Sequence, residues 1–132
     1  MHEAQNTELA AQLLDVVNEA ELEDFLRKLA KKTLRTIGRP LSGAAQGALM
    51  GELRRTAERT LPALSVAVGH RTLPSAPAAT QAASRMFGVE LEGMSPEDRD
   101  FEIARQFVRF AQSETARAAG VAAPRPQTSN GG

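Results

Sequence analysis

The apolar residues of this chain recur at intervals of three and four, and this spacing constrains the fold more than any other feature. The clearest case is EAELEDFLRKLAKKTLRTI, residues 19–37. Five of its residues fall within about 80° of one helical face, namely Leu22, Leu26, Leu29, Thr33 and Ile37. Its cations lie on the other side, namely Arg27, Lys28, Lys31, Lys32 and Arg35. The segment therefore predicts an amphipathic helix.

Capping residues place the ends of this and the other predicted helices. Thr7 and Asn18 are suited to cap the first and second helices, and Pro40 is suited to the first turn of the third. Ser95 followed by Pro96 and several acids is a strong start signal for the last helix. No run of residues with a strand pattern is long enough to build a sheet. The sequence predicts an all-α fold of four to five helices with closely packed Gly/Ala interfaces, at about residues 7–17, 19–37, 40–60, 76–87 and 96–119.

Length and composition predict one domain with a thin core. The 132 residues suit a single helical domain over residues 1–120, followed by a flexible Pro- and Gly-containing tail over 121–132. Hydrophobic residues make up 42% of the chain, but 23 of them are alanine. The chain has neither Trp nor Tyr and only five Phe, so it lacks the aromatic anchors typical of ligand pockets.

Charge is balanced overall but divided into blocks. Residues 1–24 carry seven acids and no Lys or Arg, residues 25–59 carry nine bases and two acids, and residues 87–102 carry six acids and one base. With a net charge of zero, no global field attracts nucleic acid. No segment has the length and apolarity of a membrane span or the pattern of a signal peptide. We expect a cytoplasmic protein by default, with export by a route that leaves no visible signal still open.

The residues that could support catalysis or metal binding are few and scattered. Cysteine is absent, and His2 and His70 have no second ligand at metal-binding spacing. No nucleophile elbow, P-loop or dinucleotide fingerprint occurs. We therefore expect no enzyme and assign no catalytic, cofactor-binding or metal-binding residue.

Three glycines at four-residue spacing, Gly43, Gly47 and Gly51, lie in the third predicted helix. Glycine within a helix costs up to about 1 kcal/mol relative to alanine. The resulting groove, a glycine zipper, allows another backbone to approach closely. Two interpretations follow: the alanine-rich helix 76–87 of the same chain fills the groove, or another copy or another protein does.

The basic face of helix 19–37 also leaves alternatives open. Its cations are either solvated and paired locally, as in Glu23–Arg27 and Asp24–Lys28, or they contact an acidic partner protein. Contact with nucleic acid or anionic lipid is the third alternative. In a homo-oligomer, acids within residues 1–24 or 90–102 of one copy would meet bases within residues 27–59 of the next.

Two stretches resemble segments of a group of uncharacterised bacterial proteins. ELEDFLRKLAKKTLRTIGRPLSGAAQGALMGEL with RTLPALSVAVG is similar to a Gly/Ala/Lys-rich helical segment of that group. The box LEGMSPEDRDFEIARQFVRFA, at residues 91–111, is similar to the acidic turn and terminal helix that follow it. The resemblance covers most of residues 21–119 and implies a recurring helical module with no established activity. Here the glycines are fewer and arginines partly replace lysines, which argues against a membrane role for the zipper.

The sequence thus predicts a non-enzymatic helical subunit that self-assembles into a homo-oligomer or filament. The alternative is an adaptor that binds a partner protein or a membrane surface through helix 19–37. The predicted interface residues are Gly43, Gly47, Gly51, Arg27, Lys28, Lys31, Lys32, Arg35, Glu90 and Glu92.

Overall fold

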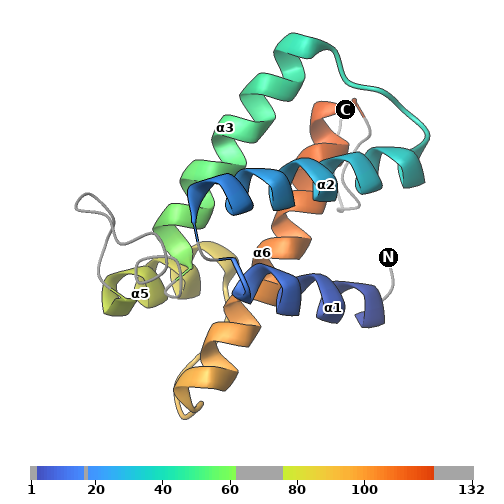
Figure 1. Cartoon of the computed structure of the whole chain (residues 1–132). Coiled ribbons are helices and arrows are strands. Elements are labelled where there is room, and N and C mark those ends of the chain that lie inside the picture. Colours follow the sequence, from blue (N-terminus) through green and yellow to red (C-terminus); the bar gives the residue numbers. More distant parts are fainter. Residues whose placement is uncertain (1–2, 17, 62–75, 121–132) are drawn as a thin grey trace, which may run out of the picture.

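The computed structural model describes residues 3–16, 18–61 and 76–120. These residues form five helices and no strand, so the prediction of an all-α fold is confirmed. The helices are α1 (Glu3–Leu14), α2 (Glu19–Ile37), α3 (Gly43–Thr60), α5 (Ala76–Phe87) and α6 (Pro96–Ala118), and Figure 1 shows their arrangement. The predicted loop around His70, the predicted tail 121–132 and His2 lie outside the described residues.

Helix α6 is the element on which the others assemble. Helices α1 and α2 both cross α6, and each packs on α6 rather than closely on the other (Figure 1). Helix α3 packs against α2 and α6, and α5 packs against α3 and α6. Because α1 and α2 share a support without interlocking, a depression remains between them on the outer surface.

The core confirms the apolar faces predicted for α2 and α6. Phe107, Ile103 and Val108 of α6 are completely buried, as are Leu22 and Leu26 of α2. A side chain of this size contributes roughly 1.5–3 kcal/mol when it is fully buried. These two helices therefore supply most of the large side chains at the centre.

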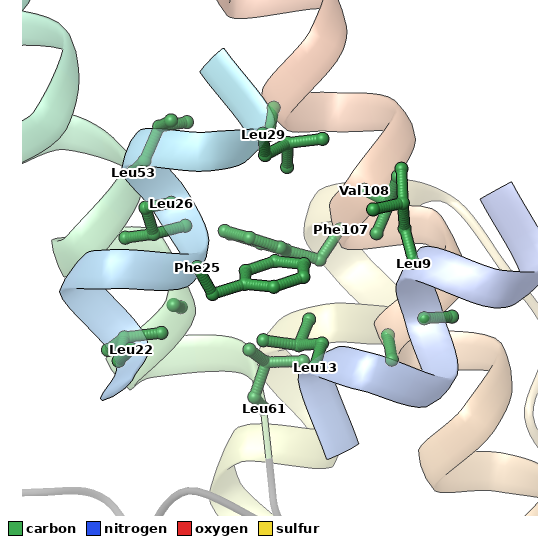
Figure 2. Close-up of a cluster of buried hydrophobic side chains, with 14 of the residues drawn as sticks. Leu9, Leu13, Leu22, Phe25, Leu26, Leu29, Leu53, Leu61, Phe107 and Val108 are labelled. Atoms are coloured by element: carbon green, nitrogen blue, oxygen red, sulfur yellow. The ribbon is translucent and has the colours of Figure 1, made fainter. Parts of the chain in front are cut away.

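One core aromatic falls outside the predicted stripe of α2. Phe25 is only 8% exposed and lies beside Phe107 in the middle of the cluster, with Leu9 and Leu13 of α1 facing it (Figure 2). The apolar stripe of the sequence predicts buried residues on one side of α2 only, and Phe25 lies next to that side. Phe25 is buried as well, because Leu9 and Leu13 of α1 reach toward this flank of α2 (Figure 2).

Most of the predicted helix ends are confirmed. The side chain of Asn18 accepts a hydrogen bond of 2.8 Å from the backbone N–H of Glu21, and that of Ser95 accepts one of 3.2 Å from Asp98. Each bond satisfies one of the donors that a helix start leaves unpaired. Gly38 ends α2 in the left-handed conformation, at a φ of 83°.

Two predicted helix starts are wrong. Helix α1 begins at Glu3, so Thr7 lies inside it and does not cap it. The first turn of α1, before Thr7, is stabilised by packing on α6, where the side chain of Gln112 donates a hydrogen bond to that of Asn6 at 3.1 Å. Helix α3 begins at Gly43 and not near Pro40, because the hydroxyl of Ser42 accepts a hydrogen bond from the N–H of Ala45 at 3.2 Å and caps the helix there.

Candidate association surfaces

The glycines of α3 lie on the surface of the chain and not in an intramolecular groove. Gly43 and Gly47 are exposed, and a Cβ built on either would meet no atom of the described residues within 4 Å, apart from the adjacent backbone of α3. A Cβ on Gly51 would meet only the side chain of Arg55, at 3.8 Å. The interpretation in which the alanine-rich helix 76–87 fills this groove is therefore wrong.

Helix α5 does pack on α3, but its alanines do not reach the glycines of α3. Ala79 and Ala83 of α5 are completely buried, and so are Leu53 and Ala57 of α3. Gly47 lies about 160° around the helix from Leu49, which also faces the core. The leucines determine which face turns inward, because burying leucine removes far more apolar area from water than burying glycine.

The fold itself does not need these glycines. The positive-φ glycines of the described chain are Gly38, Gly88, Gly93 and Gly120, so those of α3 have ordinary helical geometry. Gly43 is the first residue of the helix, which leaves Gly47 and Gly51 as interior glycines. Together these two cost up to about 2 kcal/mol relative to alanine. Among the residues that the structure describes, no close contact offsets that cost.

All five cations of the predicted basic face of α2 are exposed. They are Arg27, Lys28, Lys31, Lys32 and Arg35. Of the two expected ion pairs, Asp24–Lys28 forms at 3.1 Å, whereas Glu23 and Arg27 do not pair in the described chain. The side chains of Lys28 and Asp24 are 76% and 54% exposed, so solvent screens their attraction strongly. Local pairing therefore accounts for little of this charge.

A groove between α1 and α2 borders four of these cations. We call it the α1–α2 groove; its cavity measures about 270 Å³, with an apolar floor of Leu9, Phe25 and Leu29. Its rim consists of Lys28, Lys31, Lys32 and Arg35. A second hollow of about 420 Å³ shares Gln12, Phe25 and Lys28 with it and continues toward Asp15, Glu21 and Asp24. The combined depression is thus cationic at one end and acidic at the other.

The acidic turn, residues 90–98, connects α5 to α6 at one end of the molecule (Figure 1). Its four carboxylates, Glu90, Glu92, Glu97 and Asp98, are all exposed. Leu91 is only 6% exposed, and the hydroxyl of Ser84 donates to the carbonyl of Val89 at 2.8 Å just before the turn. Within the described residues, no ion pair joins Glu90 or Glu92 to α2. The structure does not bring together the acidic and basic residues predicted for the interface.

A hollow of about 410 Å³ lies beside the acidic turn and is bordered by Thr80, Gln81, Glu90, Glu92 and Arg99, among others. The Nε of Arg99 is buried there and makes no hydrogen bond within the described chain. Burial raises the pKa of the neighbouring Asp100; the charge of Arg99 opposes this shift, and that of Glu97 adds to it. The walls of this hollow therefore present both acidic and basic side chains.

One turn further along α6, Glu102 is held by its neighbours. Burial acts to raise the pKa of Glu102. Hydrogen bonds from Gln106 at 2.9 Å and Arg105 at 2.8 Å, with the charges of Arg105 and Arg109, outweigh burial and lower that pKa. Glu102 is therefore held ionised within the helix surface rather than poised to exchange a proton near neutral pH.

The floor of the α1–α2 groove is the part of this surface that sequence reasoning missed. Phe25 stands at the edge of the apolar stripe of α2, and an aromatic residue there is the available signal that a second element covers that flank. The position of α1, which supplies Leu9, was not part of the prediction.

Comparison of the chain with protein-family models, with curated proteins and with solved structures found no match. The resemblance to a bacterial helical module therefore stays a prediction. Among the described residues, no three His, Asp or Glu side chains are grouped as a metal site would require. None of the described helices combines the length and the apolarity needed to cross a membrane.

Proposed function

We propose that this protein is a helical subunit that acts by associating with other copies of itself, with the outer face of α3 as one contact. The observation that supports this best is the pair of interior glycines on the outer face, the exposed Gly47 and the half-buried Gly51, at positions where the described fold does not require glycine. Alanine would fit at Gly47 and would stabilise the isolated helix. The free-energy cost of the two glycines is offset if the backbone of a second copy lies against them.

The chemistry of the outer face fits close contact between backbones. Its first half presents Gly43, Ala44, Gly47 and Ala48, all exposed. Small residues let two helices approach closely, which increases dispersion contacts and permits Cα–H···O interactions. In the described chain Met86 is the one exposed large hydrophobic residue, so a contact between copies must rely on small residues and charge.

Substitution of Gly47 by leucine tests the proposal. Leucine fits the single chain, because Gly47 is exposed and no described atom beyond the adjacent helix backbone lies within 4 Å of a Cβ there, so helicity and thermal stability should be retained. Association should weaken by roughly 10- to 100-fold, because overpacking a close contact costs about 1–3 kcal/mol. The measurement is sedimentation velocity over a concentration series, with circular dichroism as the check on folding.

Ala11→Leu is the matched control, since Ala11 is an exposed helical residue on α1, away from α3. It adds the same apolar side chain to the surface and should leave association unchanged. If Gly47→Leu associates as tightly as the unmodified chain, the outer face of α3 is not a contact.

An adaptor that binds an acidic partner protein is the second candidate function. The exposed cations of α2 support it, since four of them border a groove with an apolar floor. Charge reversal at Lys28, Lys31 and Lys32 should then abolish partner recovery and leave helicity intact. Unchanged recovery of the same partner by the reversed variant would eliminate the adaptor.

A further inference from the structure

We propose that the α1–α2 groove binds the acidic turn, residues 90–98, of a second copy, so that copies join head to tail. This inference rests on the proposed self-association, but it uses a surface separate from the glycine face of α3. Because the groove and the turn are different surfaces, the contact is heterologous. Repetition of such a contact makes a closed ring or an open filament.

The groove offers cations that the chain itself leaves available. Lys31, Lys32 and Arg35 are exposed, and within the described residues none of them lies within ion-pair distance of a carboxylate. Lys28 has one partner, Asp24, at 3.1 Å. The rim thus carries four positive charges around an apolar floor, a combination that suits an anionic polypeptide segment.

The acidic turn supplies the complementary charge. Residues 90–98 contain four exposed carboxylates and no base. The buried Leu91 and the Ser84–Val89 hydrogen bond hold the start of the turn. Gly93 makes the reversal at a φ of 85°. A segment that is already ordered loses little conformational entropy when it binds.

The location of the turn favours contact with another copy. The turn and the first residues of α6 form one end of the molecule, beyond α1 and α5 (Figure 1). The acids of the second hollow, by contrast, lie in the same depression as the cations. They could reach another copy only if two depressions faced each other. An antiparallel pairing that matches Asp24 with Lys32 would then place Lys28 against Lys28.

The burial of the groove floor argues against an anionic membrane as the occupant. Leu9, Phe25 and Leu29 are 7%, 8% and 1% exposed, so little apolar surface is available for insertion. Interfacial helices bind lipid by burying an apolar face, with charge as an added attraction. Charge complementarity with an ordered acidic segment is the stronger fit.

Two charge-reversal variants and their mixture test the proposal by sedimentation velocity. Lys31→Glu/Lys32→Glu reverses the groove, and Glu90→Lys/Glu92→Lys reverses the turn. Each variant alone should associate at least about tenfold more weakly, since like charges then face each other. A 1:1 mixture should regain association, because each variant keeps one unaltered surface and the two altered surfaces complement each other.

Arg27→Glu/Arg59→Glu is the matched control, because it changes the net charge equally at exposed sites outside the groove. It should associate as the unmodified chain does. If the mixture is no better than its components, or if the control weakens association equally, the inference is overturned. Tight binding of the unmodified chain to phosphatidylglycerol vesicles, with no loss of association in Glu90→Lys/Glu92→Lys, would also overturn it.

Gly47→Leu separates this inference from the proposed function. Loss of association in Gly47→Leu with no effect of either charge reversal would support the α3 contact and overturn the proposed groove contact. The reverse pattern would support the groove contact and overturn the proposed α3 contact. An unmodified chain that stays monomeric at every concentration would overturn both proposals.

Discussion

The two faces of α3 belong to the same helix but differ in burial and in the size of their side chains. The inner face carries Leu49 and Leu53, which are 5% and 0% exposed and pack into the core. The outer face carries Gly43 and Gly47, where a Cβ would meet no described atom beyond their own helix within 4 Å. A face selected only for solubility and stability would carry alanine or charged residues at these positions. The inner face maintains the fold, and the difference supports the proposal that the outer face contacts another copy.

The largest effect is expected from the inner face. Leu53→Ala should lower the free energy of unfolding by about 2–5 kcal/mol, because it removes buried methyl groups and leaves a cavity. Urea denaturation followed by circular dichroism measures this change. A loss well under 1 kcal/mol would show that the inner face does not pack as described.

A smaller effect of opposite sign is expected on the outer face. Gly47→Ala should raise the free energy of unfolding by about 0.5–1 kcal/mol, because alanine fits there and restricts the unfolded chain. The measurement is urea denaturation at a concentration where the chain is monomeric.

Gly38→Ala provides the matched control for that substitution. Gly38 has a φ of 83°, which side chains rarely adopt, so alanine there should destabilise the protein by roughly 1 kcal/mol. Destabilisation by Gly47→Ala in the monomer would mean that the fold does use Gly47, and the contrast between the two faces would disappear.

The smallest effect is expected at the charged end of the outer face. Arg55 pairs with Glu52 at 3.1 Å, with side-chain exposures of 67% and 50%. Arg55→Ala should change the free energy of unfolding of the monomer by less than about 0.5 kcal/mol, since exposed pairs contribute little. A loss above about 1 kcal/mol would indicate that Arg55, which lies over Gly51, stabilises α3 in a way that a surface pair does not.

Sequence reasoning succeeded where a helix is long, periodic and well capped. Helix α6 is the best example: Ser95 and Pro96 mark its start, and Ile103, Phe107 and Val108 recur at helical spacing on the buried face. These signals are local, so they need no knowledge of the neighbouring elements. The end of α2 at Gly38 was predicted for the same reason.

The features that depend on tertiary packing could not be read from the sequence in this way. The start of α1 at Glu3 depends on contact with α6, and the burial of Phe25 depends on the position of α1. The spacing of the glycines predicts that they share one side of α3, but it does not say whether that side meets α5. The leucine face of α3 turns inward because burying leucine removes more apolar area from water than burying glycine does.

Sedimentation equilibrium of the unmodified chain, from micromolar to millimolar concentration, tests the central claim most directly. A subunit that acts by self-association should show a weight-average mass that rises above the 14.1 kDa of one chain as concentration increases. A mass that stays at 14.1 kDa throughout the range would contradict the account.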